Sequence, residues 1–203
     1  MITRNVGIFL FDEIEVLDFA GPFEVFCTAS RVKLRQQPEH PAPFSVYTVA
    51  RHTRDILARG GLCVTPAEAF ATHRPLDVVI IPGGIVTDEL QTPEVIAWIR
   101  NVADNADITA SVCTGAFLLA KAGLLNGKTA TTHWEDIADL RGMFPNLTVK
   151  ERVRWVDEGS IITAAGISAG IDMSLHIVAR LEGEELAIRT ARQMEFDWTP
   201  VPD

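Results

Sequence analysis

Short apolar runs alternate along the chain with longer amphipathic segments, and this alternation constrains the fold more than any other feature. Val78–Ile81 is a continuous β-branched run, and Ile108–Val112 is the next segment with the composition of a buried strand. Such runs are typical of strands covered on both faces of a parallel sheet. Parallel strands are joined by crossover connections, usually helices. The pattern therefore predicts an α/β fold, with a mostly parallel central sheet and helices on both faces.

The same reasoning predicts the individual elements. Strands are expected at Val6–Phe11, Phe44–Ala50, Val78–Ile81, Ile108–Val112, Lys128–Thr131, Thr148–Val156 and Ser160–Ala164. Helices are expected at Leu17–Arg35, Pro93–Asn101, Ala116–Ala122, Glu135–Phe144, Ala169–Leu181 and Glu184–Gln193. Thr92 is placed to cap the second helix, and Pro93 suits its first position. The sequence contains no internal repeat or linker, so residues 1–203 are predicted to form a single domain.

Composition and charge limit the partners that the chain is expected to have. Hydrophobic residues make up 47% of the 203 residues and charged residues 22%, as in soluble globular proteins. The net charge of -9 comes from 27 acidic and 18 basic residues, which disfavours nucleic acid as a partner. The apolar run near the N-terminus is too short for a signal peptide or a membrane span. We expect a cytoplasmic protein with no membrane partner.

The three cysteines are too few and too scattered for a disulfide framework. None belongs to a C-x-x-C pair, so no metal site is predicted. Cys27 lies on an apolar helix face and Cys63 in a strand-like run, and both are interpreted as structural. Cys113 has a different neighbourhood.

Cys113 directly follows the predicted strand Ile108–Val112, and the helix-forming segment Ala116–Ala122 begins three residues later. Only Cys113, Thr114 and Gly115 remain to turn the chain, which is the arrangement of a nucleophile elbow. A thiol at a helix N-terminus is expected to have a lowered pKa, because the helix dipole favours the thiolate. We therefore predict that Cys113 is an exposed nucleophile. The alternative is a small buried hydrophobic residue.

Two further loops follow predicted strands and are expected to reach the same edge of the sheet as Cys113. The Pro82-Gly83-Gly84 loop offers the backbone N–H groups of Gly83 and Gly84 to a developing anion, although an ordinary turn explains this tripeptide equally well. Asp18 is framed by apolar residues, so burial is expected to raise its pKa and keep it protonated. The alternative for Asp18 is a helix N-cap.

No histidine follows Cys113, because Thr114 occupies that position. The general base is therefore not identified by adjacency to the nucleophile. His133 and His176 are the remaining candidates, and a single histidine is more often structural than catalytic.

Four blocks of the sequence together resemble a known family. These are IEVLDFAGPFEVF, DVVIIPGG, SVCTGAFLLAKAGLLNGKTATTHW and ITAAGISAGIDMSLHIV. They are similar to the PfpI/ThiJ branch of the class I glutamine amidotransferase-like superfamily, and the resemblance covers nearly the whole chain. It implies a flavodoxin-like three-layer sandwich that forms a homodimer.

Within this branch the pattern most resembles the isonitrile (isocyanide) hydratases, which have an aspartate in the LDFAGP block and Cys-Thr at the elbow. Here these residues are Asp18, Cys113 and Thr114. Many other members have glutamate in the first position and histidine after the cysteine, so the difference argues against a Cys-His hydrolase. The resemblance implies a lyase that hydrates small-molecule isonitriles to N-substituted formamides without a metal or organic cofactor.

The same resemblance suggests roles for the site residues. Cys113 would attack the isonitrile carbon to form a thioimidate, Asp18 would supply the proton, and Thr114 would orient the reacting groups. Gly166 and Ile167, in the GISAG stretch, are expected to line the same pocket. The alternative for Ile167 is a simple core residue.

Two other functions remain open. One is another cysteine-dependent enzyme of the superfamily, of glyoxalase or amidase type. The other is a noncatalytic small-molecule or redox sensor, because the sensor halves of AraC-type regulators have the same blocks. Such regulators continue into a helix-turn-helix region, and the length and acidic charge of this chain favour an enzyme.

Overall fold

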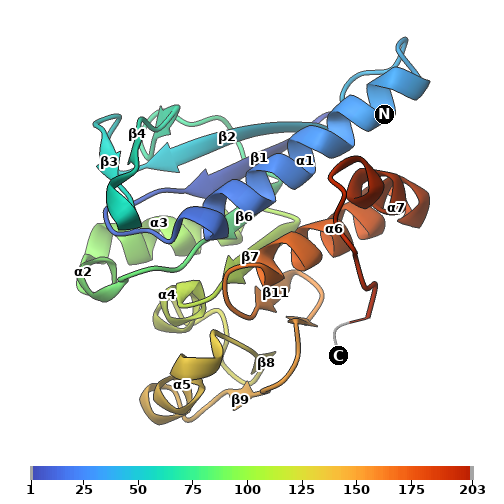
Figure 1. The fold of residues 1–203 in the computed structure, drawn as a ribbon. Coiled ribbons are helices and arrows are strands. Elements are labelled where there is room, and N and C mark those ends of the chain that lie inside the picture. The colour runs from blue at the N-terminus through green and yellow to red at the C-terminus, as the bar shows by residue number, and fades with distance from the viewer. Residues whose placement is uncertain (1, 202–203) are drawn as a thin grey trace.

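The computed structural model describes residues 2–201 and is built around a seven-stranded sheet (Figure 1). The strand order is β10-β11-β7-β6-β1-β2-β5. Neighbouring strands are parallel except for the pair β10–β11. The bounds are β1 Arg4–Phe9, β2 Phe44–Ala50, β5 Glu68–Ala69, β6 Val78–Ile81, β7 Ile108–Val112, β10 Trp155–Asp157 and β11 Ile161–Ala164. The predicted α/β class and mostly parallel sheet are confirmed.

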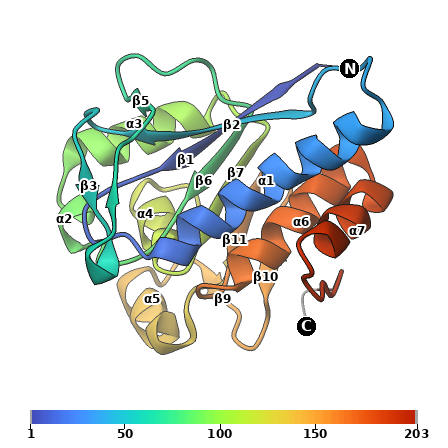
Figure 2. The same ribbon diagram turned by 45° about the horizontal axis from the view of Figure 1, so that its top comes forward.

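Helices cover both faces of the sheet and complete a three-layer sandwich (Figures 1 and 2). On one face α1 packs against α6, α7 and β2, and on the other α4 packs against α3, β6 and β7. The bounds are α1 Val16–Gln36, α2 Thr87–Leu90, α3 Pro93–Ala103, α4 Gly115–Lys121, α5 Ile137–Met143, α6 Ala169–Glu182 and α7 Glu184–Gln193. Within residues 2–201, no helix combines the length and the apolar character needed to cross a lipid bilayer.

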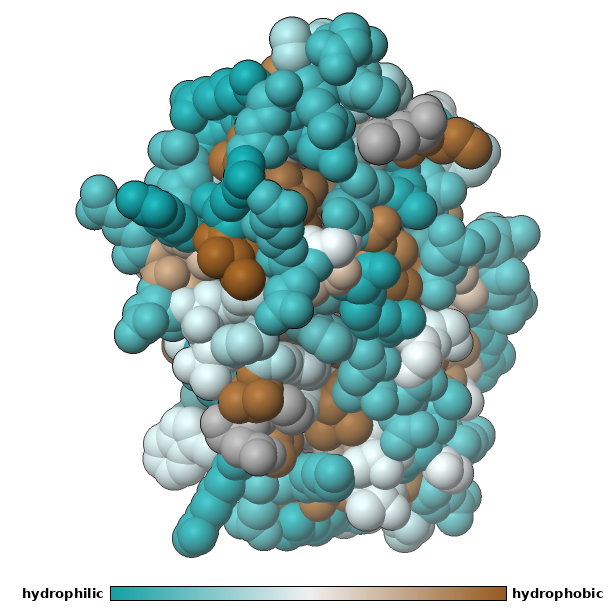
Figure 3. All heavy atoms as spheres, turned by 90° about the vertical axis from the view of Figure 1, so that its right-hand side faces the viewer, coloured by the Kyte–Doolittle hydropathy of each residue, from teal (hydrophilic) through white to brown (hydrophobic). Residues whose placement is uncertain are grey.

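The core lies on both sides of the central strands. Every residue of β6 and of β7 is buried, as expected for parallel strands with helices above and below. Figure 3 shows one outer face of the molecule, which is mainly hydrophilic with small, separated hydrophobic patches. The apolar side chains are thus concentrated in the two layers next to the sheet.

The predicted strand Thr148–Val156 is wrong, because the chain leaves the extended conformation in its middle. Only β9 (Thr148–Val149) and β10 (Trp155–Asp157) are strands, and Arg152 between them has a φ of 60°. A left-handed residue breaks the alternation of a strand. The intervening polar segment instead lies at the surface beside the start of α5.

Several short elements were not predicted, because they are too short to show a hydrophobic periodicity. The two-residue strands β3 (Ile56–Leu57) and β4 (Cys63–Val64) form a hairpin around a 3-10 turn, η1, at Arg59–Gly61. Strand β8 (Thr129–Ala130) lies within the predicted strand Lys128–Thr131, but it pairs with β9 outside the main sheet.

Two predicted helix starts also differ. The segment expected to be helical from Glu135 begins as a 3-10 turn, η2 (Trp134–Asp136). Thr92 does precede α3, but its side chain makes no capping bond and donates instead to the Asp88 carbonyl at 2.8 Å.

Candidate functional site

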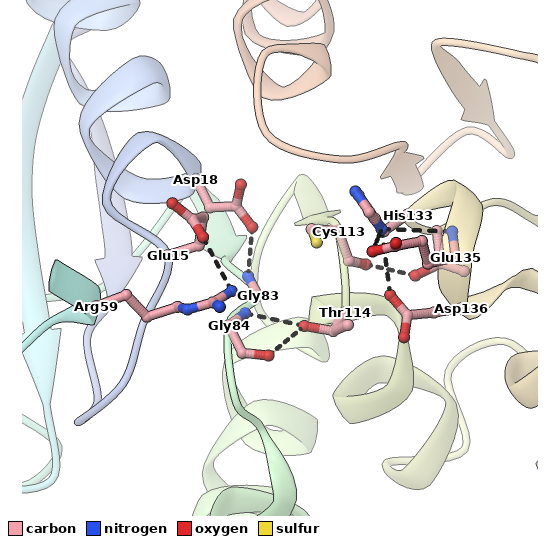
Figure 4. A network of polar contacts seen from close by, with 11 residues as sticks. Glu15, Asp18, Arg59, Gly83, Gly84, Cys113, Thr114, His133, Glu135 and Asp136 are labelled. Carbon is pink, nitrogen blue, oxygen red and sulfur yellow. Dashed lines mark hydrogen bonds and ion pairs between the residues drawn. The ribbon is translucent and has the colours of Figure 1, made fainter.

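The predicted site residues come from the segments that follow the carboxyl ends of three neighbouring strands. Asp18 follows β1, Gly83 follows β6 and Cys113 follows β7. The chain leaves β1 toward β2 on one side, whereas β6 and β7 lie on the other. This reversal of strand order is where open parallel sheets commonly bind ligands. The structure therefore brings Asp18, Gly83 and Cys113 together at a topological switch point (Figure 4).

Cys113 is the turning residue between β7 and α4, as predicted. Its φ of 56° is left-handed, which is unusual for a residue with a side chain and costs about 1–3 kcal/mol. The backbone holds this conformation, since the Cys113 N–H donates to the Ala165 carbonyl at 3.1 Å. Gly115 permits the sharp turn, because a Cβ there would collide with the Ile81 carbonyl oxygen. The geometry is that of a nucleophile elbow.

The prediction that Cys113 is exposed and has a lowered pKa is wrong. Its exposed fraction is 8%. Burial, which has the largest effect, and the nearby Asp18 charge together raise the pKa of the Cys113 thiol to about 12. The Thr114 N–H and hydroxyl act in the opposite direction but have smaller effects. The dipole of a short helix does not compensate for the loss of water around the sulfur, so the resting group is a neutral thiol.

Asp18 is fully buried, and its carboxyl lies beside the Cys113 thiol. Burial raises the pKa of Asp18 to about 7, as predicted in direction, and the Glu15 charge contributes. Hydrogen bonding to Gly83, Cys113 and Ile167 opposes this rise. Oδ2 accepts from the Gly83 N–H at 3.0 Å, whereas Oδ1 has no hydrogen-bond partner among residues 2–201. Asp18 lies within α1, so the alternative N-cap reading is wrong.

Gly83 and Gly84 lie at the site, but their N–H groups already have acceptors. The Gly83 N–H donates to Asp18, and the Gly84 N–H donates to the Thr114 hydroxyl oxygen at 2.9 Å. The Thr114 hydroxyl in turn donates to the Gly84 carbonyl at 2.9 Å. The two N–H groups thus fix Asp18 and Thr114, which differs from the expected free oxyanion site.

The two glycines also allow the loops to approach each other closely. A Cβ on Gly83 would lie 2.6 Å from the Thr114 nitrogen. Gly84 has a φ of 137°, and a Cβ there would collide with the Glu13 carbonyl oxygen. The loop after β1 is bonded to this one through the Glu15 N–H and the Gly83 carbonyl at 2.9 Å. Asp18 is therefore held rigidly against the elbow.

A cleft of about 210 Å³, here called the Cys113 cleft, opens over the sulfur. Its lining residues are Glu15, Arg59, Gly84, Cys113, Thr114, His133, Glu135, Asp136 and Ile167. Sequence reasoning missed Glu15, Arg59, Glu135 and Asp136. Arg59 comes from the unpredicted η1 turn and donates to Glu15 at 3.2 Å. The acids beside His133 in the sequence were the only available signal for that part of the cleft.

The two candidate histidines have different surroundings. His133 lines the cleft, with Nδ1 3.5 Å from an Asp136 oxygen and 3.7 Å from a Glu135 oxygen. His176 lies on α6, where it pairs with Asp157 at 2.7 Å, and it does not line the Cys113 cleft. Of these two histidines, only His133 is thus placed near the Cys113 sulfur.

The GISAG residues lie on the same side as His133. Ile167 lines the cleft and has a left-handed φ of 53°, an outlier for a β-branched residue. Gly166 packs against the His133 ring, with which a Cβ would collide. Among residues 2–201, no group of three or more His, Cys, Asp or Glu side chains is arranged to hold a metal ion.

Together the fold and the elbow define an α/β protein with a buried cysteine poised at the switch point of a parallel sheet. Residues 4–180 match the model of the DJ-1/PfpI family, and the chain belongs to this family. The sequence is 34% identical to isonitrile hydratase of Pseudomonas putida, over 99% of this chain and 81% of that protein. The family includes enzymes.

Other relatives are regulators or structural neighbours. The chain is 28% identical to the HTH-type transcriptional regulator GbdR of Pseudomonas aeruginosa, over 96% of this chain, and spans about half (51%) of that regulator. A THiJ/PfpI family protein from Pseudomonas syringae has a TM-score of 0.84 at 28% identity, covering 98% of this chain and 78% of that one. Enzyme and regulator relatives thus share this fold.

Proposed function

We propose that this protein is a cysteine-dependent isonitrile hydratase, a lyase that converts R–N≡C and water into the formamide R–NH–CHO. The observation that carries the proposal is the buried Asp18 carboxyl beside the Cys113 thiol, with a pKa of about 7 and one oxygen that has no hydrogen-bond partner within residues 2–201. A carboxyl with this pKa exchanges protons near neutrality. The identity with the P. putida isonitrile hydratase supports the same reaction.

The first half of the reaction forms a covalent intermediate. Ionised Asp18 takes the proton from the Cys113 thiol, and the thiolate attacks the terminal isonitrile carbon. Asp18 then gives that proton to the same carbon, so that a C–S and a C–H bond replace the carbon lone pair and one C–N π bond. The product is a thioimidate, R–N=CH–S–Cys113, and Asp18 is ionised again.

The second half hydrolyses the thioimidate. Water adds its oxygen to the carbon while Asp18 passes a water proton to the nitrogen. The tetrahedral adduct collapses with formation of C=O and loss of the C–S bond, and the hydroxyl proton returns to the sulfur. One carboxyl thus moves every proton, and the Gly83 N–H keeps it in position.

Incubation with phenyl isocyanide tests the proposal directly. We expect N-phenylformamide from the wild-type protein, none above background from Cys113→Ala, and an unchanged rate from Cys63→Ala, since Cys63 is an exposed free thiol on the β3–β4 hairpin. A wild-type protein that forms no formamide would refute the proposal. Turnover of methylglyoxal instead would identify a glyoxalase-type enzyme.

A noncatalytic sensor is the second candidate, because the resting thiol is neutral and a regulator shares the fold. A sensor is expected to bind a small molecule in the Cys113 cleft without converting it. Saturable binding of phenyl isocyanide without product, measured on the same samples, would favour this candidate.

A further inference from the structure

A second hollow, here called the Trp134 groove, opens beside the Cys113 cleft. It has a volume of about 560 Å³ and is lined by residues 131–134, 137, 151–154 and 165–167. His133 and Ile167 line both the groove and the cleft, so the two hollows are adjacent. A molecule that reacts at the Cys113 sulfur and is long enough to pass these two side chains would therefore enter the groove.

The groove has a flat aromatic side. Trp134 belongs to η2 and is 76% exposed, which is unusual for so large an apolar side chain. Ile137 and Val153 add apolar surface to the lining. An indole face next to aliphatic side chains suits a planar, apolar group.

The groove is also lined by charged side chains from the segment between β9 and β10. Arg154 is held by Asp172 and by the Ser168 hydroxyl, the latter at 3.2 Å, and Glu151 accepts from Arg141 at 3.1 Å. Arg152 makes no hydrogen bond or ion pair with any side chain in residues 2–201. Its guanidinium is thus available to an anion, and guanidinium groups bind carboxylates through paired hydrogen bonds.

We propose that the Trp134 groove binds the organic substituent of the molecule that reacts at Cys113, and that it selects a planar apolar substituent ending in a carboxylate. This rests on the proposed function, because it takes Cys113 as the point of reaction. The Cys113 cleft holds the isonitrile carbon, Trp134 stacks on the ring, and Arg152 pairs with the carboxylate.

Two nearly isosteric probes test the assignment, 4-isocyanobenzoate and its neutral counterpart 4-isocyanobenzamide. We expect Arg152→Gln to raise the KM of the benzoate about 2- to 5-fold, the effect of an exposed ion pair, with kcat and the benzamide KM unchanged. Trp134→Ala is expected to raise both KM values about 3- to 10-fold. Arg189→Gln, on α7 at the opposite side of the molecule, is the matched control and should change neither.

Equal changes with the two probes in Arg152→Gln, or no change in either variant, would overturn the assignment. Binding of 4-formamidobenzoate, the expected product of the benzoate probe, is followed by quenching of tryptophan fluorescence and separates this result from failure of the proposed function. Binding that weakens in Arg152→Gln while no isonitrile is hydrated would leave the groove assigned and the hydratase refuted. Hydration of both probes with no difference between them in Arg152→Gln would support the hydratase and refute the assignment of the groove.

Discussion

The two walls of the Cys113 cleft differ in rigidity and in access to solvent. The Asp18 wall is defined as Gly84 and Thr114, which line the cleft, together with Asp18 and Gly83, which do not line it. Their polar groups are joined by hydrogen bonds of 2.9–3.0 Å across tightly packed glycines. The His133 wall consists of His133, Glu135, Asp136 and Ile167. Here His133 Nδ1 lies 3.5 Å from an Asp136 oxygen and 3.7 Å from a Glu135 oxygen, and Glu135 is 63% exposed. In our interpretation, the rigid wall carries out the proton transfers and the open wall admits and selects the substrate.

Replacing a carboxyl group on each of the two walls is expected to give the largest difference in kcat. Asp18→Asn is expected to reduce kcat for isonitrile hydration about 10²- to 10⁴-fold, because the amide cannot accept the thiol proton. Asp136→Asn on the His133 wall is the matched control and should reduce kcat far less. Steady-state kinetics on folded variants measures both values of kcat. Equal losses of kcat would show that the proton transfers are not confined to the Asp18 wall.

Glycines on the two sides of the cleft test the difference in packing. Gly115→Ala is expected to lower the free energy of unfolding by about 1–3 kcal/mol or more, because its Cβ would meet the Ile81 carbonyl. Gly142→Ala, in α5 behind the His133 wall, has open space and should be neutral or stabilise the protein by about 0.5–1 kcal/mol. Urea unfolding measures both, and an equal destabilisation would contradict the difference in packing.

The pH dependence of isonitrile hydration tests whether Asp18 accepts the thiol proton. Asp18 has a raised pKa of about 7, so it is protonated below that pH and cannot take the thiol proton. We expect kcat/KM to rise about tenfold per pH unit below pH 7 and to level off above it, well before the thiol ionises near 12. The rising limb should be lost in Asp18→Asn. A limb that persists in that variant would assign it to another group.

Much of the Asp18 wall was predictable, because its signals are local in the sequence. The structure places β6 at Val78–Ile81 and β7 at Ile108–Val112, the predicted bounds, since buried parallel strands have a distinctive composition. The small residues around Cys113 indicated the elbow. The apolar neighbours of Asp18 indicated its raised pKa.

The remaining features depend on contacts between segments far apart in the sequence. The pKa of Cys113 was predicted in the wrong direction, because it is set by burial and by Asp18, which is 95 positions away. The acceptors of the Gly83 and Gly84 N–H groups also come from distant segments. Beside the His133 wall, the left-handed Arg152 and the Trp134 groove have no local sequence signal.

The covalent intermediate provides the most direct test of the central claim, that Cys113 attacks the isonitrile carbon with Asp18 as the proton carrier. Intact-protein mass spectrometry of samples quenched during turnover of phenyl isocyanide should show a mass gain equal to the whole isonitrile. Peptide analysis should place this gain on Cys113, and it should be absent in Cys113→Ala. Formamide production without an adduct, and undiminished in Cys113→Ala, would contradict the account.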